Sequence, residues 1–246
     1  MIGIVAVSHS HALAAAAVDL ALQMGGADPP AVRIAAGGPD GTLGTDAAAI
    51  ATAIDEADSG DGVLVLMDLG SALLSAEMAT ELVTGQARVA LSPAPFVEGL
   101  VIAVVTAVGG ASLDTVAAEC AGAIEAKRRQ LGEEHAGNAH AGEAASGIAA
   151  SDDGAELWFD AVIAHPSGLH ARPAALFVKA ASRHDADVRI ADLDAGSAPV
   201  SARSLLAVMA LGVRQGAHVR VSARGDGARA ALDELRAVID DGFGER

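Results

Sequence analysis

The first 130 residues alternate short apolar runs with alanine-rich segments, and this alternation restricts the fold more than any other feature of the chain. Residues 2–7 and 62–67 are continuous apolar runs, as expected of strands buried on both faces of a parallel sheet. Shorter runs at 31–35 and 87–91 predict two further strands. Helices are expected over residues 13–24, 45–57, 71–83, 96–108 and 112–129. The pattern predicts an α/β domain with an open parallel sheet.

A second domain is expected after a segment without apolar periodicity. Residues 133–154 are mostly Ala, Gly, Glu, His, Ser and Asp, which is typical of a flexible linker. Strands are then predicted at 156–163, 186–190, around Pro199 and at 217–223, with helices at 171–182, 204–211 and 227–240. The order βαββαβα predicts a small α+β open-faced sandwich. We expect domains over 1–131 and 155–246, joined by a linker over 132–154.

Charge and composition exclude several classes of partner. The formal net charge of -16 repels phosphate backbones and anionic headgroups, so neither nucleic acid nor a membrane surface is an expected partner. Residues 2–7 follow Met1 without a basic leader, and no apolar stretch is long enough to cross a bilayer, which predicts a cytoplasmic protein. The single cysteine, Cys120, lies among small residues in a helical pattern and is expected to be a buried structural thiol.

Residues 167–174 read Ser-Gly-Leu-His-Ala-Arg-Pro-Ala and place a histidine where a loop becomes a helix. With His170 as the helix cap, the N–H groups of Ala171 and Arg172 would point toward its ring, and Pro173 would cost no helical hydrogen bond. Such a helix terminus binds anions, and Arg172 adds a positive charge for a phosphoryl group on His170. A capping histidine beside a solvent-facing arginine fits the same geometry equally well.

This motif resembles the active site of the HPr family, and the likeness extends over residues 156–240. Residues 201–213 are similar to the segment that holds the regulatory serine of HPr and its helix. The resemblance implies that His170 accepts phosphate from enzyme I with help from Arg172. Ser204 matches the regulatory position, but we interpret it as an ordinary helix cap. His165 has no matching catalytic position, and His184 and His218 are expected to be surface or half-buried polar residues.

Two polar residues follow the apolar strands of the first domain. His9 comes at the carboxyl end of the first strand and Asp68 at that of the strand over 62–67, and these ends line the ligand crevice of a parallel sheet. If the strands are neighbours, Asp68 can bind one ring nitrogen of His9 and leave the other free to attack phosphorus. We expect the phosphate to be bound by Ser10, Gly70, Ser71 and Ala171.

Other interpretations of this site remain open from spacing alone. His9 could be a polar strand cap and Asp68 a helix-entry residue. His9 and His11 could also bind a metal, although the helix turn would aim them differently, and we expect no metal.

Residues 2–10 and the sequence Met-Asp-Leu-Gly-Ser at 67–71 resemble the mannose-type IIA domain, over about residues 1–131. That family has an open α/β sheet, and its members dimerise. Ser-His-Ser and Asp-Leu-Gly-Ser are closer to the DhaM family, the phosphotransferase subunits of dihydroxyacetone kinases, than to sugar-transport relatives, which more often carry Thr-His-Gly and Asp-Leu-Phe-Gly-Gly. DhaM-type proteins also include fusions to HPr in this order.

The combined resemblance implies a phosphoryl relay. Phosphate from phosphoenolpyruvate would reach His170 through enzyme I, move to His9, and pass to ADP held with Mg²⁺ by the DhaL subunit, which works with DhaK. The chain itself would bind no cofactor and would form a homodimer through its N-terminal domain. Two alternatives are a IIA–HPr component that feeds a sugar-specific IIB domain, and a regulatory binding protein controlled by phosphorylation.

Overall fold

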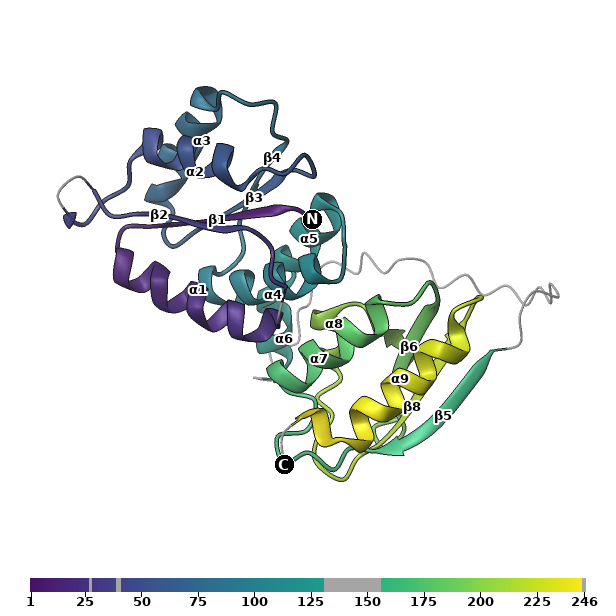
Figure 1. The fold of residues 1–246 in the computed structure, drawn as a ribbon. Coiled ribbons are helices and arrows are strands. Elements are labelled where there is room, and N and C mark those ends of the chain that lie inside the picture. The colour runs from purple at the N-terminus through teal and green to yellow at the C-terminus, as the bar shows by residue number, and fades with distance from the viewer. Residues whose placement is uncertain (27, 39–40, 131–155, 245–246) are drawn as a thin grey trace.

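The computed structural model describes residues 1–26, 28–38, 41–130 and 156–244. The N-terminal domain is built from four strands and six helices, in the order β1 (Gly3–Ser8), α1 (His11–Gly25), β2 (Val32–Ala36), α2 (Ala47–Ala57), β3 (Val63–Met67), α3 (Ser71–Leu82), β4 (Val89–Ser92), α4 (Phe96–Val108), α5 (Leu113–Ala121) and α6 (Ala123–Gln130). The strands pair in the order β2-β1-β3-β4, all parallel, which confirms the predicted open sheet (Figure 1).

Both faces of this sheet are covered by helices, so its central strands are almost entirely apolar. Ile4 and Leu64 point into a core shared with α1 and α4, while Val5 and Val65 point into a second core shared with α2 and α3. Figure 1 shows the two helix layers on opposite sides of the sheet. The continuous hydrophobic runs of β1 and β3 follow from this double burial.

The C-terminal domain has the order β5 (Leu157–Val162), α7 (Ala171–Ser182), β6 (Asp187–Asp192), β7 (Val200–Ser201), α8 (Leu205–Ala210), β8 (His218–Arg224), α9 (Ala228–Asp240) and the short 3-10 turn η2 (Gly242–Gly244). Its antiparallel strands pair in the order β5-β8-β6-β7. Phe159 of β5 is buried under α9, whereas neighbouring Trp158 is 56% exposed on the other face. The predicted βαββαβα open-faced sandwich is therefore confirmed.

The two domains touch through helices. Lys179 on α7 donates from Nζ to the carbonyl oxygen of Gly25 at the end of α1, over 3.3 Å. Ser204, before α8, donates from Oγ to Oε2 of Glu119 on α5, over 2.7 Å. Apolar residues of α4 and α6 also pack near α7 and α8.

One predicted helix was wrong. Residues 112–129 form two helices, because α5 ends at Ala121, Gly122 is its C-cap, and α6 begins at Ala123. Glycine is a weak helix former, and a Cβ at Gly122 would collide with the side chain of Leu206 from the other domain. The predicted domain end at Leu131 and the linker over 132–154 lie outside the described residues. No helix in the described part of the chain is long and apolar enough to cross a membrane.

Candidate functional site

His9 and Asp68 meet because β1 and β3 are neighbours in the sheet. Val7 of β1 lies in register with Met67 of β3, so the residues that follow both strands emerge side by side at the carboxyl edge. The N–H of Asp68 donates to the carbonyl oxygen of Val7 over 3.1 Å and extends the pairing by one residue. The predicted contact between His9 and Asp68 required β1 and β3 to be neighbouring strands, and they are.

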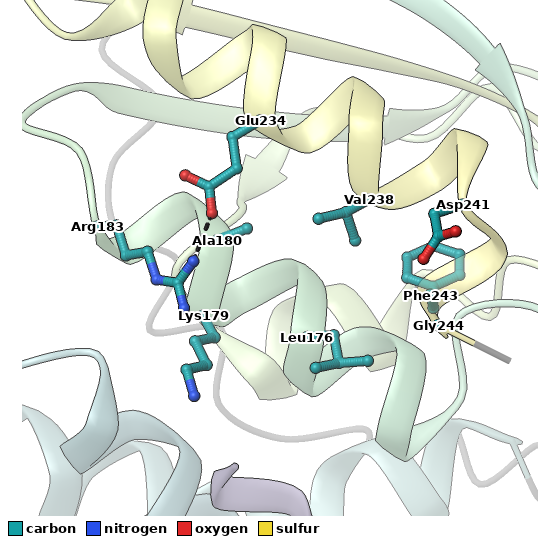
Figure 2. A pocket seen from close by; sticks show the side chains of 9 residues that line it. All are labelled: Leu176, Lys179, Ala180, Arg183, Glu234, Val238, Asp241, Phe243 and Gly244. Carbon is teal, nitrogen blue, oxygen red and sulfur yellow. Dashed lines mark hydrogen bonds and ion pairs between the residues drawn. The ribbon is translucent and has the colours of Figure 1, made fainter. Parts of the chain in front are cut away.

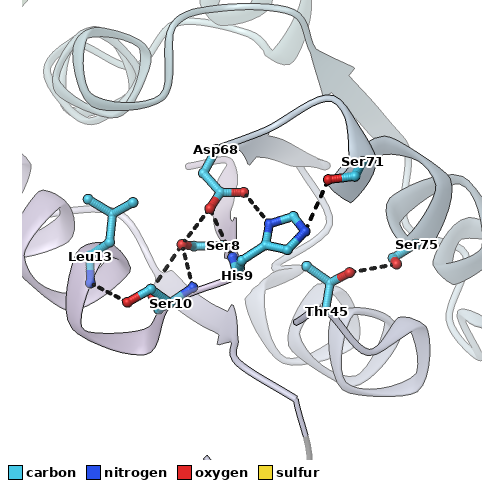
Figure 3. A network of polar contacts seen from close by, with 8 residues as sticks. All are labelled: Ser8, His9, Ser10, Leu13, Thr45, Asp68, Ser71 and Ser75. Atoms are coloured by element: carbon cyan, nitrogen blue, oxygen red, sulfur yellow. Dashed lines mark hydrogen bonds and ion pairs between the residues drawn. The ribbon is translucent and has the colours of Figure 1, made fainter. Parts of the chain in front are cut away.

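The Asp68 carboxylate binds the His9 region with both oxygens (Figure 3). Its Oδ1 lies 3.0 Å from Nδ1 of His9, and its Oδ2 accepts the backbone N–H of His9 and the hydroxyl of Ser8, each over 2.9 Å. Burial acts to raise the pKa of Asp68, but these hydrogen bonds outweigh it, so the pKa lies below its ordinary value of 3.8. Asp68 is therefore a carboxylate near neutral pH, and it holds the proton of His9 on Nδ1.

The other ring nitrogen of His9 faces α3. The hydroxyl of Ser71 lies 3.1 Å from Nε2, as Figure 3 shows. With the proton on Nδ1, Nε2 carries a lone pair and accepts this hydroxyl. The His9 side chain is 26% exposed, so the lone pair lies at an accessible surface. The ring is thus oriented for nucleophilic attack through Nε2.

The predicted phosphate ligands of this domain take different positions. Gly70 precedes α3 and Ser71 begins it, so both lie at the open N-terminal end of that helix. Ser10 instead caps α1, because its hydroxyl accepts the N–H of Leu13 over 3.4 Å. A cavity of about 450 Å³ opens beside Asp68 and Gly70, between the ends of β3 and β4.

Sequence reasoning missed the part played by Ser8. This residue is fully buried at the end of β1, where it donates to Asp68 and accepts the N–H of Ser10 over 3.0 Å. The one available signal was a serine inside an otherwise apolar strand, which needs a buried partner.

His170 lies at the N-cap of α7, as predicted. Its backbone is extended, its carbonyl oxygen accepts the N–H of Ala174 over 2.8 Å, and its side chain makes no capping hydrogen bond. The His170 and Arg172 side chains are exposed, while Pro173 is buried in the first turn. Because the first N–H groups of a helix point out of its N-terminal end, those of Ala171 and Arg172 lie on the side of α7 from which an anion on the His170 ring would approach.

The structure does not bring His9 and His170 together. His9 precedes the first turn of α1, whereas α1 contacts α7 through its last residue, Gly25. Figure 1 shows the first turn of α1 on the side of the N-terminal domain away from α7. Each histidine thus has its own site in this arrangement.

The other histidines and the cysteine considered in the sequence have surroundings that fit a structural role. His184 is half-buried against Glu234 and His218 is exposed beside Asp194, in agreement with the expectation for both. Cys120 is buried, and its burial, with the nearby Glu119 charge, raises the pKa of the thiol to about 12, which leaves it unreactive. Within the described residues no group of three or more His, Cys, Asp or Glu is placed to hold a metal.

Two family models match the chain. Residues 3–117 match the model of the PTS system fructose IIA component (EIIA-man), and residues 159–241 match that of the PTS HPr component phosphorylation site. A solved relative, the HPr-C-His protein of Thermoanaerobacter tengcongensis, is 38% identical and covers 37% of this chain and 98% of its own, with a TM-score of 0.35.

Curated relatives match the whole chain. The phosphoryl donor subunits DhaM of PEP-dependent dihydroxyacetone kinase from Escherichia coli (strain K12) and Klebsiella michiganensis are each 39% identical over 100% of this chain and 51% of the relative. The multiphosphoryl transfer protein of Haemophilus influenzae is 44% identical over 34% of this chain and 17% of its own length. The chain spans about half the length of the DhaM relatives. The matches confirm the resemblances drawn from the motifs.

Proposed function

We propose that this chain is a phosphotransferase-system protein that joins a IIA domain to an HPr domain, and that it carries phosphoryl groups on His170 and His9 for a dihydroxyacetone kinase. The observation that carries the proposal is the pair of contacts on His9, with Asp68 on Nδ1 and Ser71 on Nε2. This arrangement selects one tautomer and presents one nitrogen. The similarity to DhaM subunits, which extends over the whole of this chain and 51% of the relative, supports the choice of acceptor.

Three phosphoryl transfers of the relay involve this chain. A phosphoryl group passes from phosphoenolpyruvate to enzyme I and then to His170, where a phosphorus–nitrogen bond forms on the ring as the bond between phosphorus and enzyme I breaks. Nε2 of His9 then attacks that phosphorus, so that a new phosphorus–nitrogen bond forms as the one to His170 breaks. The phosphoryl group finally moves from His9 to the terminal phosphate oxygen of ADP, which DhaL holds with Mg²⁺. This chain contributes positioning and charge, and the nucleotide and metal belong to DhaL.

In the structure His9 and His170 lie apart, so the transfer from His170 to His9 requires the two histidines to come together. Either α7 leaves α1, or the His170 of one chain serves the His9 of another. We propose a homodimer through the N-terminal domain as the setting. Exposed apolar residues spaced four apart on α3 support it: Leu74 is 67% exposed, Met78 60% and Leu82 51%. Light scattering of the intact chain tests the dimer.

The relay is tested with labelled phosphoenolpyruvate and enzyme I, followed by DhaL with bound ADP, DhaK and dihydroxyacetone. We expect His170→Ala to block all labelling and His9→Ala to stop the label at His170, while the control His11→Ala labels normally. Label in dihydroxyacetone phosphate supports the proposed acceptor. Loading of both histidines without transfer to DhaL would favour a sugar IIB domain or a regulatory role, and no loading at all would refute the carrier role.

Mixing the two blocked variants distinguishes the routes. If His9→Ala and His170→Ala chains together restore transfer, phosphate passes between chains. If the mixture stays inactive, His170 serves the His9 of its own chain.

A further inference from the structure

The loop that ends in His170 is held by His165. This residue is only 6% exposed, and its Nδ1 accepts the N–H of Ser167 over 3.2 Å while its carbonyl oxygen accepts the N–H of Gly168 over 2.9 Å. Leu169 is then fixed by donating to the carbonyl oxygen of Val213 over 3.0 Å. Two successive N–H groups of the active-site loop therefore donate to residue 165, that of Gly168 to its backbone and that of Ser167 to its ring, which must present an unprotonated Nδ1.

His165 is held in turn by the ring of Phe243 in η2. The two rings meet edge to face, with centroids 6.0 Å apart and an interplanar angle of 85°. Phe243 is 3% exposed and also borders a cavity of about 240 Å³ between α7 and α9, which Leu176 lines as well (Figure 2). The last described turn of the chain is thus packed against the first residues of the active-site loop.

The backbone conformation of Phe243 indicates that its surroundings hold this residue in place. Phe243 has φ 61° and ψ 31°, and within the described residues it alone has a positive φ without being glycine. A side chain with a Cβ is disfavoured in that region, so surrounding contacts must hold it there. Strained backbone conformations concentrate at functional sites. Here the strained conformation of Phe243 accompanies the contact of its ring with His165.

We propose that His165 and Phe243 are positioning residues for His170. The ring of Phe243 fixes the imidazole of His165, which fixes the N–H of Ser167 and so the path of the loop into the cap of α7. The inference rests on the proposed phosphorylation of His170. It assigns to η2, over 70 residues from His170 in the sequence, a part in setting the direction of that imidazole.

The test compares His165→Leu, which removes the acceptor, with His165→Asn, whose side-chain oxygen takes the place of Nδ1. Exposed His218→Leu on β8 is the matched control, and Phe243→Leu removes the ring of the second residue. Circular dichroism first shows which variants are folded. Two readouts follow: the rate of His170 labelling as enzyme I is increased to saturation, and the nitrogen chemical shifts of the His170 ring without enzyme I.

We expect His165→Leu and Phe243→Leu to lower the saturated rate by about tenfold, with half-saturation changed by less than about twofold, because a displaced nucleophile reacts more slowly once bound. Both should shift the His170 ring signals, whereas His165→Asn and His218→Leu should resemble the wild type. Folded Leu variants with wild-type rates and shifts would overturn the proposal. If His165→Leu does not fold, Phe243→Leu decides in the same way, with His218→Leu as its control.

The two readouts separate this inference from the proposed function. If enzyme I does not label the wild type at His170, the carrier role is refuted. The positioning role of His165 and Phe243 is then tested only by the nitrogen chemical shifts of the His170 ring. If labelling is normal and the ring signals of His170 are unchanged in the variants, the carrier role stands and the positioning is refuted.

Discussion

Oδ1 of Asp68 lies 3.0 Å from Nδ1 of His9, although 59 residues separate them. Asp68 is 6% exposed and its other oxygen accepts two further hydrogen bonds, so the carboxylate has little freedom to turn. The same contact orients the imidazole and determines which nitrogen carries the proton.

Asp68→Asn should slow phosphoryl transfer to His9 by at least about 10²-fold. The amide oxygen would accept from the backbone N–H of His9 and from Ser8, which turns the amide NH₂ toward Nδ1 and moves the ring proton to Nε2. Rapid-quench measurement of label passing from His170 to His9 checks this. Asp46→Asn, which keeps an N-cap on α2, is the control and should transfer at the wild-type rate.

Phosphate on His9 should be attached to Nε2. Asp68 occupies Nδ1, and only Nε2 presents a lone pair, beside the hydroxyl of Ser71. Phosphorus and nitrogen NMR of the phosphorylated protein distinguishes the two isomers. A phosphorus–nitrogen bond at Nδ1 would contradict this tautomer.

The stability that Asp68 contributes should depend on pH in a defined direction. Because the folded protein lowers the pKa of Asp68 below 3.8, the unfolded state binds the proton more tightly. The contribution is complete above that ordinary value and is lost as the pH falls through the lower folded pKa. The difference in unfolding free energy between wild type and Asp68→Asn should therefore be constant above about pH 5 and shrink in stronger acid. Denaturant titrations at several pH values measure it.

Ser204→Ala should destabilise α8 by about 1 kcal/mol, because the hydroxyl of Ser204 caps that helix by accepting the N–H of Ala207 over 3.0 Å. Hydrogen exchange of the α8 amides reports the loss. Ser112→Ala removes the corresponding cap of α5 and should weaken α5 alone. Unchanged protection of α8 in Ser204→Ala would show that the cap is dispensable.

Gly168→Ala should destabilise the HPr domain more than Gly212→Ala does. Both glycines have a positive φ, 63° and 64°, but a Cβ at Gly168 would collide with the carbonyl oxygen of Val213, while Gly212 has open space. Strain of this kind costs on the order of 1–3 kcal/mol, and the collision adds to it at Gly168. Thermal unfolding measures the stability of the two variants. Equal losses of stability would mean that the loop around Gly168 shifts to accommodate the added Cβ.

The local pattern of the chain was sufficient for the architecture. Continuous apolar runs predicted a sheet covered on both sides, and the helices over Phe96–Val108 and Ala171–Ser182 have the expected bounds. The close approach of Leu206 from the other domain, which leaves no room for a Cβ at Gly122, could not be foreseen from the local pattern, because it depends on how the two domains pack.

The sequence by itself determined the fold of both domains and the two histidines at their strand and helix ends, since periodicity and helix-terminal residues act over a few neighbours. Only the tertiary structure decided what touches those histidines. The burial of Ser8 on Asp68 and the packing of Phe243 on His165 join residues 60 and 78 positions apart. Such contacts depend on strand order and on the path of the last turn, which local residue patterns do not encode.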